Sequence, residues 1–136
     1  MRRVALIVFY DGENRVLLQY RKGIASKFQE EWGYFGGKIE DGETPEQAVV
    51  RETKEELDFD LSGDFKFLGK FENKIKGFES EAFVFISPLV DKMEKFRQLE
   101  GEEMRLFSLE DAEKLKMGPG DKEILKELGK CLIKNE

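Results

Sequence analysis

The chain has 136 residues, no histidine and a formal net charge of −6, and these values exclude several classes of protein. The acidity argues against nonspecific binding to nucleic acid, and the lack of histidine leaves acid-base and metal chemistry mainly to carboxylates. A chain of this size is expected to form one domain, here residues 1–136.

The first apolar segment and the single cysteine bear on the expected compartment. The apolar run Val4–Phe9 is far shorter than the roughly 20 residues that a membrane span needs, so no membrane association is expected. Cys131 has no second cysteine with which to form an internal disulfide, which fits a reducing compartment. We therefore expect a cytoplasmic location.

Two strands and a turn are expected at the start of the chain. Val4–Phe9 and Arg15–Tyr20 are rich in aliphatic residues and flank a turn at residues 11–14, which is typical of a β-hairpin. A basic loop over residues 21–27 and a glycine-rich stretch over residues 32–37 follow.

A helix is expected over residues 45–57, and local sequence signals mark its start. Thr44 is suited to cap the helix, Pro45 to occupy the first helical position, and Gln47 to complete a capping box. The residues expected to face the core are Val49, Val50, Thr53 and Leu57.

The second half of the chain is expected to contain strands over residues 65–72 and 81–87 and a short strand near 104–107. Ser108 is suited to cap a short helix, and Gly120 or Asp121 to open a final amphipathic helix. Strands and helices mix without regular alternation. This order predicts an α+β fold within the broad α/β class, with a mixed β-sheet between helices.

Three glutamates, Glu52, Glu55 and Glu56, share one face of the helix expected over residues 45–57. At 3.6 residues per turn they fall within roughly 100° of one another, where their charges repel. A bound cation would relieve this repulsion, and clustered oxygen ligands suit Mg²⁺ or Mn²⁺. The alternative is an ordinary solvated acidic face.

The residues around these glutamates match a known signature: Gly, five residues, Glu, seven residues, Arg-Glu, two residues, and Glu-Glu. Its fixed positions are occupied by Gly37, Glu43, Arg51, Glu52, Glu55 and Glu56. The chain therefore resembles the Nudix family, and the segments GGKIE and GETPEQAVVRE resemble its MutT-like branch. The resemblance implies a Nudix-type αβα sandwich and a Mg²⁺-dependent (or Mn²⁺-dependent) hydrolase acting on phosphoric anhydride bonds.

Three positions depart from the family pattern. Phe35 stands where the family usually has proline, Thr53 replaces an aliphatic residue, and Asp58 replaces the glycine that ends the helix. Glycine reaches the left-handed conformation at a helix end more easily than aspartate does. The departures therefore concern the shape of the loop and the end of the helix, and they leave the expected chemistry intact.

The metal ligands that the resemblance implies are the carboxylates of Glu52, Glu55 and Glu56 and the main-chain carbonyl of Gly36. Glu55 also counts among the catalytic residues, together with Arg51 and Glu43. Arg51 lies about 40° from Glu55 around the helix, so it is expected to pair with Glu55 or to brace the loop. Glu43 is expected to accept hydrogen bonds that hold the loop against the helix.

The resemblance also implies a glutamate in a loop after the fifth strand, acting as a metal ligand or general base. Glu102 and Glu103 precede an apolar segment at the expected place, and we favour Glu103 as this catalytic and metal-binding residue. The alternative is an acidic turn after Gly101.

Four residues are candidates for substrate binding. Arg21 ends the second expected strand and is placed to hold a phosphate, and Lys38 follows the double glycine. Tyr34 matches a position beside the nucleotide in MutT-like proteins, and Asp121 lies near the place where relatives read the purine. A helix N-cap is the alternative for Asp121. Trp32 is expected to pack within its loop instead of stacking on a base.

The expected activity is hydrolysis of nucleoside triphosphates, including oxidised purine deoxynucleotides, to a monophosphate and pyrophosphate. Two alternatives remain open. One is hydrolysis of another nucleoside diphosphate linked to a sugar or a second nucleoside, and the other is a catalytically silent Nudix-fold sensor. The expected partner is a small nucleotide, with no nucleic acid and no membrane, and the chain is expected to be a monomer or homodimer.

Overall fold

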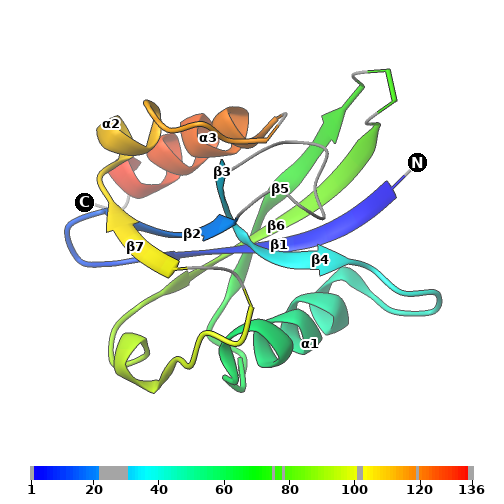
Figure 1. Ribbon diagram of the computed structural model, residues 1–136, viewed down its shortest axis with the longest axis horizontal. Helices are drawn as coiled ribbons and strands as arrows, with labels where there is room; N and C mark the ends of the chain where they lie inside the picture. The colour runs from blue at the N-terminus through cyan, green and yellow to red at the C-terminus, as the bar shows by residue number, and fades with distance from the viewer. Residues whose placement is uncertain are drawn as a thin grey trace.

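The computed structural model describes residues 2–21, 31–74, 76–77, 79–100, 103–118 and 120–134, with side chains up to residue 132. Within this part, seven strands form one sheet, with helix α1 on one face and helices α2 and α3 on the other (Figure 1). The predicted αβα sandwich with a mixed sheet is confirmed. The basic loop beyond Arg21 lies outside the described residues, as do Gly101 and Glu102. None of the described helices is long and apolar enough to cross a membrane.

The expected hairpin is formed by β1 (Arg2–Tyr10) and β2 (Val16–Arg21), which pair antiparallel. The other edge of β1 pairs in parallel with β6 (Ser80–Pro88), and β6 pairs antiparallel with β5 (Lys66–Asn73). The short strand β7 (Glu103–Phe107) pairs antiparallel with β2. The parallel contact between β1 and β6 makes the sheet mixed, as the order of elements predicted.

The glycine-rich stretch forms two short strands where the sequence indicated only a loop. β3 (Glu31–Gly33) pairs with β2, and β4 (Phe35–Lys38) pairs with β1, so the chain passes from one strand of the hairpin to the other at Tyr34. Glycine has a low intrinsic preference for strands, so pairing with β1 and β2 keeps these residues extended. As a result, the segment that approaches α1 is held by the sheet.

Helix α1 (Pro45–Leu57) begins and ends with identifiable caps. The Thr44 hydroxyl accepts a hydrogen bond from the Gln47 N–H, and the Gln47 side chain accepts one from the Thr44 N–H, which forms the predicted capping box. Asp58 adopts φ 52° and ψ 41°, the left-handed conformation that glycine usually takes, and its N–H donates to the Lys54 carbonyl. The helix therefore ends in the usual way despite the missing glycine.

The remaining helices lie in the second half of the chain. Ser108 caps α2 (Leu109–Ala112) by accepting a hydrogen bond from the Asp111 N–H, as predicted. The final helix, α3 (Asp121–Lys134), begins directly after Gly120. A short 3-10 helix η1 (Met93–Lys95), which the sequence did not indicate, precedes β7.

Apolar side chains of the sheet fill two separate cores. In β1, Ile7 and Phe9 pack on the side of α1 against Val49 and Leu57, whereas Val8 packs on the side of α3. This alternation follows from the two-residue period of a strand. The same period directs two polar side chains of β2, Gln19 and Arg21, toward Glu56 of α1, where the candidate site lies.

Candidate functional site

Arg51 is the centre of the hydrogen-bond network on the polar face of α1. Its guanidinium donates to both carboxylate oxygens of Glu43, at 2.8 and 3.0 Å, and to the main-chain carbonyl of Lys38 at 2.9 Å. It also donates to Glu52 at 3.0 Å and to Glu55 at 3.3 Å. Arg51 therefore pairs with Glu55 and also braces the loop, the two roles that the sequence left open.

Glu43 holds the loop that precedes α1. In addition to the contact with Arg51, its carboxylate accepts a hydrogen bond from the Glu40 N–H at 3.0 Å. The hydrogen bonds from Arg51, together with the one from the Glu40 N–H, lower the pKa of Glu43 to about 2. The structure thus contains the hydrogen bonds that were predicted for Glu43.

Glu56 is turned into the protein, unlike Glu55 on the same helix. It is 1% exposed, and its two carboxylate oxygens each lie 3.2 Å from the Gly36 N–H that donates to them. The Arg21 guanidinium lies 3.3 Å from one of these oxygens. Burial raises the pKa of Glu56 to about 7, although the charge of Arg21 and the Gly36 N–H oppose the shift. This carboxylate is therefore positioned by the sheet as well as by its helix.

Gly36 and Gly37 allow α1 and the sheet to approach each other closely. A Cβ atom on Gly36 would lie 2.1 Å from the Ala5 carbonyl oxygen, and the φ angle of Gly36 is +135°. A Cβ atom on Gly37 would lie 2.6 Å from the Glu52 carboxylate. The double glycine is therefore required by the position of β1 on one side and of Glu52 on the other.

Gly36→Ala is expected to lower the free energy of unfolding by about 3 kcal/mol, because the added methyl group overlaps the backbone of β1 at a φ that favours glycine. Gly12→Ala in the first turn is the control, since no atom lies within 4 Å of its Cβ position. Urea unfolding measures both variants. Equal unfolding midpoints for the two would contradict the close contact described for Gly36.

Glu52, Glu55, Glu56 and the Gly36 carbonyl are the groups available to hold a metal ion. Among the described residues, no three carboxylate or thiol side chains already converge in a metal-binding geometry. Arg51 holds Glu52 and Glu55, while Glu56 faces the Gly36 N–H. Burial raises the pKa of Glu52 and the charge of Glu55 raises it further, whereas Arg51 opposes the shift, so a bound cation would take over the compensating charge that Arg51 supplies here. An all-oxygen donor set fits Mg²⁺ or Mn²⁺.

Glu100 is an acidic residue of this site that the sequence analysis missed. It follows Leu99, whose N–H donates to the Glu56 carbonyl at 2.7 Å, so this segment packs against the end of α1. The pKa values of Glu52 and Glu56 are raised first by burial, and the charge of Glu100 adds to both shifts. The available signal was the acidic run that begins at Glu100, of which only the later glutamates were considered.

Glu103 is the first residue of β7, opposite Tyr20 of β2. Its carboxylate accepts a hydrogen bond from Arg105 at 2.9 Å and is 46% exposed. This contact does not test a role as metal ligand or general base, so Glu103 remains a prediction. Glu102, the alternative, lies outside the described residues.

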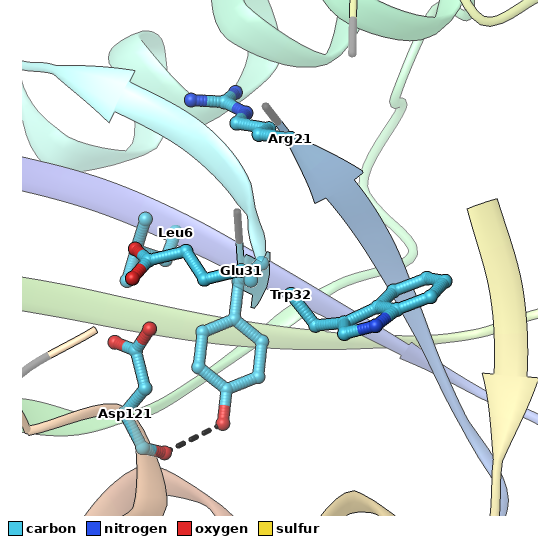
Figure 2. A pocket seen from close by; sticks show the side chains of 7 residues that line it. Leu6, Arg21, Glu31, Trp32 and Asp121 are labelled. Carbon is cyan, nitrogen blue, oxygen red and sulfur yellow. Dashed lines mark hydrogen bonds between the residues drawn. The ribbon is translucent and has the colours of Figure 1, made fainter. Parts of the chain in front are cut away.

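A cavity of about 170 Å³ lies between β3 and the start of α3 (Figure 2). Its lining consists of Leu6, Arg21, Glu31, Trp32, Gly33, Tyr34 and Asp121. Pockets that enclose a whole small ligand usually measure about 300–1,000 Å³, so this cavity suits one part of a nucleotide. Three of the four predicted substrate residues meet here. The fourth, Lys38, does not line the cavity; its side chain is exposed and its carbonyl contacts Arg51.

Arg21 and Trp32 form separate parts of the cavity wall. In Figure 2 the guanidinium of Arg21 extends toward α1, where it reaches Glu56, so Arg21 connects the cavity with the carboxylates. Trp32 packs against Tyr20 and Phe107, with ring centroids 5.2 and 4.8 Å apart. The packing predicted for Trp32 is present, but this residue also lines the cavity.

Glu31 and Asp121 direct their carboxyl groups toward each other (Figure 2). One oxygen of each lies 3.3 Å from the position that a Cβ of Gly118 would take. Burial and then the charge of Glu31 raise the pKa of Asp121 to about 7, and burial raises the pKa of Glu31. Asp121 is the first residue of α3, and its carbonyl accepts a hydrogen bond from the Tyr34 hydroxyl at 2.7 Å. Two partly buried acids therefore face the same end of the cavity.

Asp121→Asn is expected to remove a pH-dependent loss of stability. The folded pKa of Asp121, about 7, exceeds its ordinary value of 3.8, so ionisation destabilises the fold. This cost is absent below about pH 4 and complete above about pH 7, where it should reach about 4 kcal/mol. Urea unfolding of both proteins between about pH 4 and 8 measures the difference. A difference that stays constant with pH would contradict this role of Asp121.

The sequence profile of the NUDIX domain family matches residues 1–128 of this chain. The chain belongs to the Nudix family. The Nudix signature, at residues 37–56, covers the loop and helix that carry the carboxylate network described above.

Similar proteins include Nudix enzymes with different substrates in their names. An 8-oxo-dGTP diphosphatase of Proteus vulgaris is 41% identical over 59 residues, which cover 43% of this chain and 52% of that protein. The match thus spans about half the length of this relative. The solved MutT protein from Methanosarcina mazei has a TM-score of 0.75 at 20% identity, over 99% of this chain and 95% of its own. A C. elegans Ap4A hydrolase has a TM-score of 0.73 at 20% identity, over 98% of both chains. At these identities, the structural likenesses show the Nudix fold alone.

Two residues outside the Nudix signature also belong to the site and were missed in the sequence. Gln19 is fully buried in β2 beside Glu56, and the available signal was a polar residue inside an apolar strand. Glu31 faces Asp121, and no sequence pattern indicated it because β3 itself was read as part of a loop. Both residues enter the site through strand pairing.

Proposed function

We propose that this chain is a single-domain, divalent-metal-dependent hydrolase that cleaves nucleoside triphosphates to a monophosphate and pyrophosphate. The observation that carries the proposal is the position of Arg21, which lines the cavity and lies 3.3 Å from Glu56. A nucleotide with its nucleoside part in the cavity would therefore extend its phosphates toward the carboxylates of α1. The similarity to an 8-oxo-dGTP diphosphatase supports a triphosphate substrate, including oxidised purine deoxynucleotides.

Each residue of the site would have a separate role in such a reaction. A bound Mg²⁺ or Mn²⁺ would neutralise phosphate charge and make a water more acidic. Glu52, Glu55, Glu56 and the Gly36 carbonyl would hold it. Arg51 and Glu43, which paired hydrogen bonds join, would keep the loop against the helix during the reaction. Arg21 would bind a phosphate oxygen, with its charge shared between the phosphate and Glu56.

A second candidate is hydrolysis of another nucleoside diphosphate linked to a sugar or a second nucleoside. A smaller cavity of about 70 Å³ lies between β5 and the start of α3, and Asp121 lines both cavities. The smaller cavity would receive the sugar or second nucleoside. The similarity in fold to an Ap4A hydrolase supports this second candidate function. A catalytically silent sensor is disfavoured because every glutamate of the signature is present.

The test is a panel of nucleotides incubated with purified protein and Mg²⁺. It contains dGTP, 8-oxo-dGTP, the other triphosphates, ADP-ribose and Ap4A. Phosphate is measured with and without added inorganic pyrophosphatase, and the nucleotide products are separated by ion-exchange chromatography because ADP-ribose and Ap4A release neither phosphate nor pyrophosphate. The expected result is a nucleoside monophosphate whose formation EDTA abolishes, together with phosphate that appears from a triphosphate only with pyrophosphatase. Turnover of ADP-ribose or Ap4A without turnover of triphosphates would establish the second candidate.

A binding measurement separates the silent sensor from an inactive preparation. Trp32 is the single tryptophan of the chain and lines the cavity, so its fluorescence reports ligand entry without turnover. A fluorescence change with a nucleotide that is never hydrolysed would favour the sensor. Hydrolysis accompanied by a fluorescence change would support the proposed position of the nucleotide.

A further inference from the structure

Gln19 is a polar side chain that is completely buried within the sheet. It lies in β2 between Leu18 and Tyr20 and is opposite Gly33 of β3 and Met104 of β7. Because side chains alternate along a strand, Gln19 and Arg21 point to the same face of the sheet, the face that α1 covers. A buried amide on that face faces the carboxylate site and not solvent.

The hydrogen bonds of Gln19 determine the orientation of its amide. Its Nε2 donates to the Tyr34 main-chain carbonyl at 3.2 Å and to Oε2 of Glu56 at 3.5 Å. The Tyr34 carbonyl can only accept a hydrogen bond, as can the ionised carboxylate of Glu56, so the nitrogen and not the oxygen of the amide must face them. The Gln19 Oε1 is buried and has no hydrogen-bond partner among the described residues. The chain therefore retains an unpaired buried oxygen in order to direct the amide nitrogen at Glu56.

Gln19 is one of three groups that hold the Glu56 carboxylate. The others are the Gly36 N–H, at 3.2 Å, and the Arg21 guanidinium, at 3.3 Å. The Arg21 side chain is 47% exposed, whereas the amide of Gln19 is enclosed on all sides. Gln19 also holds the Tyr34 carbonyl, in the segment that leads to Gly36. It thus joins Glu56 to the backbone that forms both the cavity wall and the double glycine.

We propose that Gln19 is a positioning residue, whose buried amide holds Glu56 in the orientation that binds the divalent cation. This inference rests on the proposed metal-dependent function. Gln19 itself does not touch the cation or the substrate. Partners that orient a metal ligand typically change metal affinity or activity by about 10–100-fold when they are removed.

The test compares Gln19→Met and Gln19→Leu with the wild type, since both replacements fill similar space without a donor. Mn²⁺ alone is the probe, and its free concentration is followed by electron paramagnetic resonance as protein is added. We expect the Kd for Mn²⁺ to rise by about tenfold. The kcat should fall by a similar factor with the same substrate, whereas KM should change little because the cavity lining is intact.

Ser87→Ala is the matched control for a loss of buried polarity. Ser87 is also fully buried in the sheet, and its hydroxyl donates to the Asp64 carbonyl. Its variant should lower the melting temperature and leave Mn²⁺ affinity unchanged. A merely structural role of Gln19 predicts the same pattern for Gln19→Met. The positioning role predicts weaker Mn²⁺ binding measured well below the melting temperature of each variant.

The outcomes separate this inference from the proposed function. A wild-type protein that neither binds Mn²⁺ nor hydrolyses nucleotides would overturn both. A wild type that does both, with Mn²⁺ affinity and kcat within twofold in the Gln19 variants, would overturn the positioning role alone. Failure of both Gln19 variants to fold would assign Gln19 to the fold and would also overturn the positioning role.

Discussion

Glu55→Gln and Glu56→Gln should each lower kcat by about a thousandfold, which corresponds to about 4 kcal/mol of transition-state stabilisation. The substitution keeps the shape of the side chain and removes its charge, so a metal ligand is lost without a cavity. Glu55 is half-exposed, whereas Glu56 is buried against Gly36 and Arg21. Both variants are expected to fold, and steady-state kinetics at saturating Mg²⁺ and thermal melting measure the two effects.

Glu46→Gln is the control on the same helix. Glu46 lies exposed in the first turn of α1 and is not one of the fixed positions of the Nudix signature, so the same chemical change there should leave kcat within twofold. Near-normal turnover in both Glu55→Gln and Glu56→Gln would exclude these residues as ligands. Loss of activity with loss of the folded state would not count as support, which is why melting is measured on the same samples.

Glu100→Gln is expected to lower kcat by about a hundredfold, within the usual contribution of a general base. The expectation rests on the position of Glu100 beside the end of α1. There burial raises the pKa values of Glu52 and Glu56, and the negative charge of Glu100 raises them further. Glu103→Gln tests the residue that the family resemblance favoured. Steady-state kinetics of the two variants under identical Mg²⁺ concentrations provide the comparison.

Substitution of each of three glutamates, Glu100, Glu102 and Glu103, identifies which of them acts as general base or metal ligand. Glu102→Gln completes the series because its position was the alternative in the sequence. A hundredfold loss at Glu103 with little change at Glu100 would support the sequence-based assignment. A hundredfold loss at Glu100 alone would move the role to the start of the acidic run, and losses below about fivefold at all three would show that this loop is only a turn.

The buried state of Glu56 illustrates how one residue can serve both fold and site. Its carboxylate accepts hydrogen bonds from the backbone of β4 and from Gln19 of β2. A cation would therefore meet one ligand that is held rigidly and two, Glu52 and Glu55, that are held by Arg51. Exchange of Arg51 for a cation then requires movement at the helix surface and none in the core.

Local signals in the sequence determined the elements that carry the signature. The start of α1 follows from Thr44, Pro45 and Gln47, because a capping box depends only on residues three apart. Glu43 was expected to hold the loop, and Arg51 to pair with Glu55 or brace that loop; the structure joins the two residues through both carboxylate oxygens of Glu43. Interactions of this kind are close in sequence, so a linear pattern is sufficient to predict them.

Only the tertiary structure decided which polar residues from distant segments join this helix. Helical periodicity placed Glu52, Glu55 and Glu56 on one face, but the depth of Glu56 depends on the convergence of β2 and β4 beneath it. Gln19, Glu31 and Glu100 reach the site from strands and a segment that are separated from α1 along the chain. Strand pairing and burial bring such groups together, and neither leaves a periodic pattern around the residue itself. For this reason the sequence determined the family, the fold and the signature of this protein. The groups that surround its carboxylates and shift their pKa values could be identified only from the packed sheet.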